Sequence, residues 1–312
     1  MPERTDVHID TPLTNLSVKY SNDELIWRSV MPIVRVRKPS DKYFEYTKAD
    51  VYSIVDDAVG PKSMPNEVDW DLGTKTFTVT DHALADWVPQ EVVDASDNPV
   101  SPLVDTNDFL NERLDLAQED RVAALVFLAA TYPSGNKVTL SGTSQWSGSA
   151  DDPVSDVLTA VETCFMRANT LVFGEEAWKV FRILPEVLDA VKSSTRFQGS
   201  QGGLASSSEV ASLFDVNRVL IGRARKNTAD EGQTPAYARI WGKHMVALHV
   251  NPSPGIKGIT FGVSFVETDR TTYRDFDGKM GVKGAHYIKV GWNSDEKIIA
   301  SDLGYMIEDA VA

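Results

Sequence analysis

Histidine and cysteine, the side chains that most often hold metals or act as nucleophiles, are few in this chain. There are five histidines, at positions 8, 82, 244, 249 and 286, and one cysteine, Cys164. None of the histidines forms the i, i+4 pair that holds zinc on a helix, and the odd spacing of His244 and His249 places them on opposite faces of a strand. Cys164 lies in an apolar helical pattern without a second cysteine. We therefore expect neither a metal site nor a nucleophilic cysteine.

Two carboxylates, two glycine clusters and a basic run are the remaining candidates for chemistry. Asp69 and Asp71 would share one strand face and could bind a cation or transfer protons. The clusters GSQGG (199–203) and GKMGVKG (278–284) lack the Gly-Lys-Ser/Thr signature of phosphate-binding loops, and RARKNT (223–228) is short. Exposed hairpin acids and solvated loops explain these sequences more simply. A soluble hydrolase using Asp69 and Asp71 stays open as an alternative, and no cofactor is expected.

The segment VRVRKPSDKYFEY (34–46) joins a basic turn to aromatic residues. Arginine and lysine followed by tyrosine and phenylalanine could contact a phosphate backbone, a substrate or another protein. The charge of the whole chain argues against the phosphate backbone. The formal net charge of the 312 residues is −14, and residues 51–120 hold 3 Lys/Arg against 16 Asp/Glu. Because affinity for DNA rises with the number of phosphates that Lys and Arg neutralise, sequence-specific DNA binding is disfavoured.

The sequence contains no segment that directs the protein to a membrane. The longest apolar run, at 122–130, is far shorter than the ~18 residues that cross a bilayer core. The first ten residues, MPERTDVHID, lack the apolar stretch of a secretory signal. We expect the protein to work where it is made.

The first eighty residues lack the pattern of a packed core. Residues 1–32 place isolated apolar residues such as Trp27 among polar ones, which is typical of an extended arm that docks on a larger body. Between 33 and 80, the alternating runs VRVR, KYFEY and GTKTFTVTD surround a middle rich in Gly, Pro and acidic residues. Because proline cannot donate to an interior ladder, we interpret 33–80 as a long hairpin with an irregular tip that projects from the core.

A single long helix is predicted at 105–131. Asp105 or Thr106 can cap its N-terminus, apolar residues recur near a helical period, and Tyr132-Pro133 ends it. At 1.5 Å per residue this helix would be roughly 40 Å long. We expect its second half to be buried and its acidic first half to be solvated. The acidic residues concerned are Asp108, Glu112, Asp115, Glu119 and Asp120.

The rest of the chain alternates between helical and strand patterns. The Gly- and Ser-rich stretch 134–152 is expected to be a loop, which places a boundary near 150. Asp152-Pro153 begins a predicted helix that runs to about Arg167, and strands and helices alternate after it. The last third returns to β patterns. The fold class is therefore α+β.

The order of these elements resembles that of the major capsid proteins of tailed bacteriophages, which share the Hong Kong-type fold with encapsulin shells. The likeness begins at NDELIWRSVMPIVRVRKPSDKYFEY (22–46), where an arm ends in an apolar-Pro step and enters an extension loop. Tyr43 and Tyr46 match a Tyr-x-x-Tyr-like segment there. The helix predicted at 105–131 matches the spine helix of that family.

The likeness continues to the end of the chain. In ANTLVFGEEAWKVFRILPEV (168–187) a strand, Gly174, Trp178 and Pro185 follow one another in the order typical of the family. The stretch KIIASDLGYMIEDAV (297–311) looks like the last strand and C-terminal tail. These are similarities of order and spacing rather than chemical signatures.

The resemblance implies a subunit of five parts. These are an N-terminal arm (1–32), an extension loop (33–80), a peripheral domain with the spine helix (81–152), an axial domain (153–250), and returning strands with a C-terminal tail (251–312). Such subunits form hexamers and pentamers of an icosahedral shell around double-stranded DNA. The implied partners are further copies of the chain, the packaged DNA, a separate scaffolding protein, a portal and decoration proteins, without a membrane. The resemblance implies location in the virion capsid, and in the host cytoplasm during assembly. An encapsulin-like compartment is the alternative that the same fold allows.

In such a shell the basic turn is expected to contact neighbouring subunits rather than DNA. The basic residues concerned are Arg35, Arg37 and Lys38. The acidic partners expected on adjacent copies are Asp108, Glu112 and Asp115, in the first half of the spine helix. The expected interface anchors are Trp27, Tyr43, Phe44 and Tyr46. The resemblance supplies no catalytic, cofactor-binding or metal-binding residue.

Overall fold

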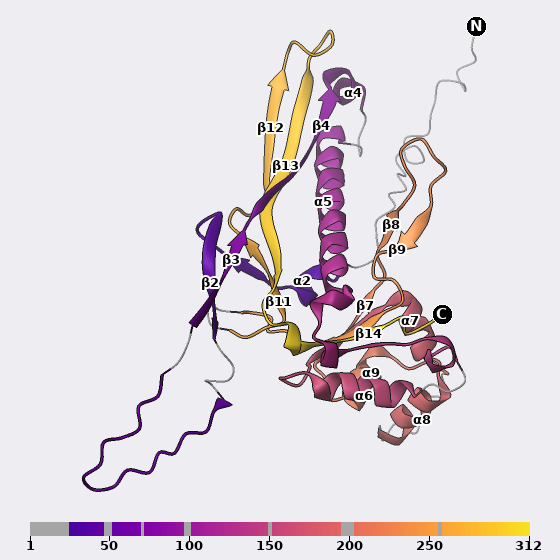
Figure 1. Ribbon diagram of the computed structural model, residues 1–312. Coiled ribbons are helices and arrows are strands. Elements are labelled where there is room, and N and C mark those ends of the chain that lie inside the picture. The colour runs from indigo at the N-terminus through magenta and orange to yellow at the C-terminus, as the bar shows by residue number, and fades with distance from the viewer. Residues whose placement is uncertain are drawn as a thin grey trace.

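The fold is organised around one long helix and two sheets (Figure 1). The computed structural model describes residues 25–46, 52–69, 72–96, 101–148, 152–194, 203–254 and 258–312. The long helix, α5 (Pro102–Val126), stands beside an elongated sheet and above a second sheet that helices cover. This arrangement is the mixed α+β architecture that the sequence pattern predicts.

The lower sheet in Figure 1 has the strand order β5-β14-β10-β6-β7. Its strands are β5 (Lys137–Thr139), β6 (Thr170–Gly174), β7 (Arg218–Gly222), β10 (Met245–Leu248) and β14 (Gly304–Glu308). β10 is antiparallel to β6 and β14, whereas β6–β7 and β14–β5 are parallel pairs. The sequence TLVFG of β6 is buried at every position, because both faces of this sheet are covered.

Helices α6 to α9 pack on one face of the lower sheet. They are α6 (Pro153–Thr163), α7 (Glu175–Phe181), α8 (Pro185–Ser194) and α9 (Ser207–Leu213). Leu171 and Phe173 of β6 join the helical layer, whereas Val172 joins the opposite layer with the end of α5. The predicted start of α6 is confirmed, since the Asp152 carboxylate accepts a hydrogen bond from Ser155 N. The helix ends at Thr163, earlier than predicted.

The upper sheet has the order β1-β11-β13-β12, and β4 also pairs with β13. Its strands are β1 (Ile33–Arg35), β4 (Thr80–Pro89), β11 (Gly262–Val266), β12 (Thr271–Asp277) and β13 (Ala285–Ile298). The first half of β13 lies between β4 and β12, and its end pairs with β11. Leu110 and Leu114 of α5 pack on this sheet in one apolar cluster with Val88, Ile288 and Val290. A short helix, α4 (Gln90–Ala95), follows β4.

The hairpin predicted between 33 and 80 is formed by β2 (Ser40–Tyr46) and β3 (Leu72–Thr78), which pair antiparallel. The run VRVR does not belong to it, because β1 pairs parallel with β11 in the upper sheet. Phe77 of β3 stacks on Phe265 of β11 at 4.5 Å between ring centroids, which fixes the root of the hairpin. Beyond that root, residues 52–69 are exposed throughout and extend away from the rest of the subunit (Figure 1).

A second hairpin lies where a solvated loop was expected. β8 (Arg225–Asn227) comes from the run RARKNT and pairs antiparallel with β9 (Tyr237–Arg239). Figure 1 shows this hairpin beside α5, on the side away from β4, β12 and β13. The Nζ atom of Lys226 lies 2.5 Å from a carboxylate oxygen of Asp120 on α5, which ties the hairpin to the helix.

The long helix differs from the prediction at both ends. It begins at Pro102, in the first turn, where proline needs no backbone donor. It ends at Val126 and is followed by a 3₁₀ turn at Ala129–Thr131. The hydroxyls of Thr131 and Tyr132 donate to the carbonyl oxygens of Leu125 and Val126. These side chains satisfy carbonyls of the last turn, so the helix ends before Pro133 would force it to.

Residues 134–148, for which the sequence pattern predicts a loop between two units, are packed against the lower sheet. They include the 3₁₀ turns Ser134–Asn136 and Gly142–Ser144 and the strand β5. Trp146 is fully buried under helices α6 to α9, and its Nε1 donates to the Asp156 carboxylate at 3.0 Å. Residues 134–148 therefore belong with the lower sheet, and the predicted boundary near 150 lies at residues outside the described ranges.

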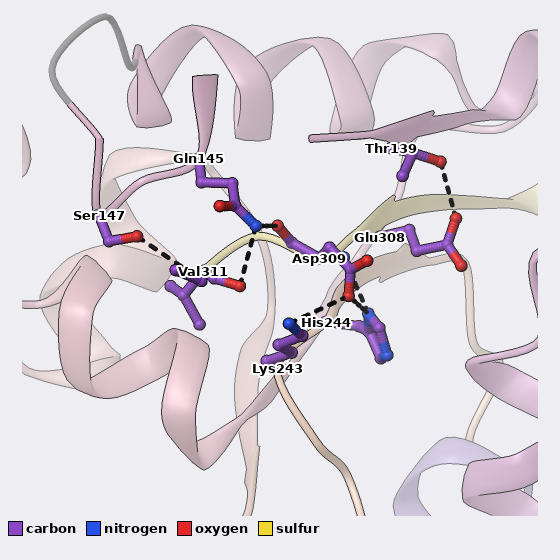
Figure 2. Close-up of polar contacts among 9 residues, drawn as sticks. Thr139, Gln145, Ser147, Lys243, His244, Glu308, Asp309 and Val311 are labelled. Atoms are coloured by element: carbon purple, nitrogen blue, oxygen red, sulfur yellow. Dashed lines mark hydrogen bonds and ion pairs between the residues drawn. The ribbon is translucent and has the colours of Figure 1, made fainter. Parts of the chain in front are cut away.

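The last residues of the chain hold this stretch in place (Figure 2). Gln145 Nε2 donates to the carbonyl oxygens of Asp309 and Val311, and Ala312 N donates to Ser147 Oγ. On the other side, Asp309 N donates to Nδ1 of His244 at 2.9 Å. These contacts come from the residues after β14, which lies between β5 and β10 in the lower sheet.

A buried carboxylate joins three distant parts of the chain. Glu119 on α5 is fully buried, although the sequence pattern predicts a solvated residue. Its Oε1 accepts hydrogen bonds from Ile26 N at 3.1 Å and from Trp241 Nε1 at 2.5 Å, and its Oε2 accepts one from Trp27 N at 2.9 Å. Ile26 precedes, and Trp27 begins, the short helix α2 (Trp27–Val30). Burial raises the pKa of Glu119, and the three donated hydrogen bonds oppose that rise.

The close approach at Gly174, where β6 leads into α7, generates a stability prediction. A Cβ atom added there would lie 2.0 Å from the carbonyl oxygen of Gly242. Because the obstacle is backbone, we expect Gly174→Ala to lower the free energy of unfolding by about 2 kcal/mol. At Gly135 a Cβ would meet nothing within 4 Å, so Gly135→Ala is the matched control. Urea unfolding that gives both variants the same stability would contradict this packing.

The buried position of Glu119 generates a pH prediction. Its pKa is raised in the folded protein, so the folded state binds more protons than the unfolded state between the two pKa values. The contribution of Glu119 to stability is therefore complete below its unfolded pKa of about 4.3 and falls as pH rises through the folded pKa. Glu119→Gln removes this titration. We expect the variant to lose less stability than the unmodified protein between about pH 4 and about pH 7.

Urea unfolding of both proteins across that pH range measures the difference. At the lower pH the variant should be the less stable protein by about 1–3 kcal/mol. The side-chain amide nitrogen introduced by Glu119→Gln cannot accept a hydrogen bond, so one backbone or indole N–H loses its acceptor. Parallel pH profiles would show that the carboxylate does not titrate in the folded state as described.

Candidate intersubunit surfaces

The residues that the sequence singles out for chemistry lie in separate places in the structure. Among them, no group of three or more His, Cys, Asp or Glu side chains could hold a metal ion. Burial raises the pKa of Cys164 to about 12, so its thiolate is not accessible at neutral pH. Asp69 lies in the exposed stretch 52–69, and Asp71 lies outside the described ranges. No helix in these ranges has both the length and the apolarity to cross a bilayer.

The basic turn lies on the surface at the root of the β2–β3 hairpin. Arg35 forms an ion pair with Asp269 at 2.9 Å, and the two side chains are 76% and 61% exposed. Lys38 forms a second exposed pair with Asp41 at 3.4 Å, and Arg37 is exposed. Such pairs contribute about 0–1 kcal/mol in water. Exchanging an intrasubunit partner for one on another surface would therefore cost little.

The aromatic residues predicted as interface anchors fall into different places. Trp27 is only 1% exposed and lies 5.6 Å from Trp292 between ring centroids, so it is a core residue of its own subunit. Tyr43 packs against Phe265 at 5.7 Å, in the cluster at the root of the hairpin. Phe44 and Tyr46 belong to β2, and their side chains lie outside the described set. The prediction of a surface contact is therefore wrong for Trp27.

The acidic first half of α5 is divided between surface and interior. Asp108 and Glu112 are exposed. Asp115 accepts two hydrogen bonds from the Arg270 guanidinium, at 2.8 and 2.9 Å, and lies 3.8 Å from Arg28. Asp115 is thus bound within its own subunit, and Asp108 and Glu112 are left to present the acidic surface.

The segment 52–69 is exposed at every position and belongs to none of the apolar clusters. We call this segment the loop tip. Its most exposed apolar side chains are Ile54, Met64 and Val68, at 101%, 92% and 64%. Tyr52, at its start, packs edge-on against Phe165, which follows α6, with 5.0 Å between ring centroids. Apolar side chains at this exposure are typical of a surface that another molecule covers.

The contacts of Glu119 and of Asp115 could not be predicted from the sequence, whereas the β8–β9 hairpin could. The contacts of Glu119 and Asp115 join residues between 87 and 155 positions apart, so no local pattern indicates them. The β8–β9 hairpin had a local signal, because RARKN and YAR flank a turn-forming stretch that contains Gly and Pro. The turn-forming residues alone predict a loop there, and the strands on either side make it a hairpin.

Comparison with known proteins was made by sequence and by structure. No family model matches the chain. The chain is 32% identical over 307 residues to a major capsid protein of Pseudomonas phage JBD67, covering 97% of each chain. It is 27% identical over 247 residues to a major capsid protein of Burkholderia phage BcepMu, covering 78% of this chain and 76% of that protein.

Solved structures share the fold over nearly the whole chain. A phage-related protein from Bordetella bronchiseptica matches with a TM-score of 0.71 at 21% identity, covering 93% of each chain. The capsid of cyanophage P-SCSP1u matches with a TM-score of 0.64 at 8% identity, covering 97% of this chain and 93% of that one. An encapsulin from Synechococcus elongatus matches with a TM-score of 0.54 at 12% identity, covering 97% and 95%.

These neighbours show the Hong Kong-type capsid fold, and the sequence relatives show more than the fold. Both relatives are capsid proteins of phages, and the first is similar along almost the full length of the chain. The surfaces described above suit a protein that contacts copies of itself. This chain belongs to the major capsid protein family of tailed bacteriophages, as a structural, non-enzymatic component of the capsid.

Proposed function

We propose that this chain forms the hexamers and pentamers of an icosahedral head that encloses double-stranded DNA. The observation that carries the proposal is the loop tip, which is exposed along its whole length and extends beyond the packed body of the subunit. A segment that exposes Ile54 and Met64 completely, or nearly so, needs a second surface to cover them. In a closed shell that surface belongs to a neighbouring copy.

Within this proposal each part of the chain has a place. Residues 1–32 are the N-terminal arm, 33–80 the extension loop, 81–152 the peripheral domain, 153–250 the axial domain, and 251–312 the returning strands and tail. Two contacts support small changes to these bounds. β1 pairs with β11 and thus belongs with the peripheral sheet, and β5 pairs with β14 and thus belongs with the axial sheet.

The acidic charge suits a wall that encloses DNA without binding it tightly. Residues 51–120 hold 16 Asp/Glu against 3 Lys/Arg, and a surface of this charge repels phosphates and lets DNA move along it. We further propose assembly in the host cytoplasm, a separate scaffolding protein, and portal and decoration proteins as partners. An encapsulin-like compartment has support from the shared fold alone.

Electron microscopy of the purified full chain, alone and with a scaffold, tests the proposal. We expect rings, sheets or closed shells, with DNA inside the shells isolated from phage particles. Shells that hold a protein cargo in place of DNA would favour the encapsulin-like compartment. A monomer under every condition would contradict the proposed assembly.

Removing the loop tip should separate folding from assembly. Deletion of 50–70, bridged by a short Gly-Ser linker, removes the exposed segment 52–69 and leaves the clusters around α5 intact. We expect an unchanged circular dichroism spectrum and a melting temperature within about 4 °C of the full chain. Sedimentation should show loss of shells. An unfolded deletion variant would mean that the segment supports the core.

Reversing the basic turn tests its contact with other copies. We expect Arg35→Glu with Arg37→Glu to reduce the assembled fraction by about tenfold while the subunit stays folded, because the proposed acidic partners lie on another copy. Adding Asp269→Arg restores the ion pair inside the subunit and serves as the control. If this third substitution restores assembly, Arg35 acts within its own subunit, and the proposed contact with a neighbour is wrong.

A further inference from the structure

The β8–β9 hairpin presents two different faces. Residues opposite each other on paired strands share a face, and here Arg225 lies opposite Arg239 and Asn227 opposite Tyr237. Lys226 lies between Arg225 and Asn227 in β8, so its side chain is on the opposite face. It points toward α5, where it pairs with Asp120. Arg225, Tyr237 and Arg239 therefore lie on the face directed away from α5. We call these three residues the basic hairpin face.

The basic hairpin face is held in a fixed shape. The register is extended at both ends by hydrogen bonds, from Ile240 N to Ala224 O at 3.0 Å and from Thr228 N to Ala236 O at 2.8 Å. The hairpin continues directly into Trp241, whose indole donates to the buried Glu119 carboxylate. A surface mounted on such a base loses little conformational freedom when a partner binds.

The composition of this face is unusual for the chain. Tyr237 is 71% exposed, and Arg225 is exposed beside it. Arg239 is half-buried, and its guanidinium donates to the carbonyl oxygen of Arg223, which holds it against the base of the hairpin. The chain as a whole carries a formal net charge of −14. Arginine and tyrosine are the residue types that most often supply binding energy at the centres of protein interfaces. An acidic partner with exposed apolar side chains would complement both the charge and the aromatic ring.

We propose that the basic hairpin face binds the loop tip of another copy of this chain, an assignment that rests on the proposed assembly. The loop tip contains Asp56, Asp57, Glu67 and Asp69 and a single basic residue, Lys62. The same segment exposes Ile54, Met64 and Val68, which can cover the ring of Tyr237. The two surfaces are thus complementary in charge and in apolar character.

DNA fits the basic hairpin face less well than the loop tip does. The connection between β8 and β9 carries Asp230 and Glu231, both exposed. A phosphate backbone lying along the hairpin would approach these carboxylates, and each would weaken its binding. A short acidic segment from another subunit can contact the arginines without lying along Asp230 and Glu231.

Charge reversal with rescue tests the contact in the full chain. We expect Arg225→Glu with Arg239→Glu to reduce the assembled fraction, measured by sedimentation and electron microscopy, by about tenfold. Adding Asp56→Arg with Asp57→Arg in the same chain should restore assembly to within about threefold of the unmodified protein, because the charges are again opposite. Lys279→Glu with Lys283→Glu, two exposed residues between β12 and β13, makes the same charge change elsewhere and should leave assembly unchanged.

The possible outcomes separate the alternatives. Normal assembly of the Arg225/Arg239 variant overturns the contact, and so does failure of the Asp56/Asp57 reversal to rescue it. Normal shells with reduced DNA content would assign the face to nucleic acid and overturn the proposal as well. If the double variant does not fold, Tyr237→Ala, at an exposed position, tests the same face and should reduce assembly. Failure of the unmodified chain to assemble would contradict the proposed function instead.

Discussion

The subunit depends on the buried carboxylate of Glu119. A carboxylate without water must be hydrogen-bonded, and its donors here are the backbone at the start of α2 and the indole of Trp241. The N-terminal segment, the spine helix α5 and the loop after β9 must therefore reach one point together. Moving the start of α2 or Trp241 away leaves a buried carboxyl group without its hydrogen-bond donors, so this contact favours one arrangement of the three segments.

Apolar packing extends outward from that point in two directions. Toward the upper sheet, Leu110 and Leu114 of α5 join the cluster with β4 and β13. Toward the lower sheet, Val122 and Val126 join the cluster that contains Trp27 and Trp241. Both clusters are complete within one subunit. The loop tip and the strands of the β8–β9 hairpin lie outside both clusters.

Local chemistry made part of this structure predictable. Asp152 and Pro153 start a helix wherever they precede an apolar period, and TLVFG is a buried strand in most surroundings. The errors arose where distant contacts decide the outcome. Trp146 lies in a Gly- and Ser-rich stretch, yet the helices above it bury it completely. Trp27 and Asp115 appeared to be surface residues because their partners, Trp292 and Arg270, are far away in the sequence.

The contrast between interior and surface electrostatics suits a protein that must fold first and assemble later. Partly buried pairs such as Asp115 with Arg270, whose side chains are 25% and 20% exposed, are screened less by water and lie within one subunit. The Arg35–Asp269 pair is largely solvated and contributes little, so Arg35 can exchange its partner. Weak, screened contacts of this kind can be broken and remade while subunits find their correct neighbours. Many of them act together once a shell closes, and closure then stabilises contacts that are individually weak.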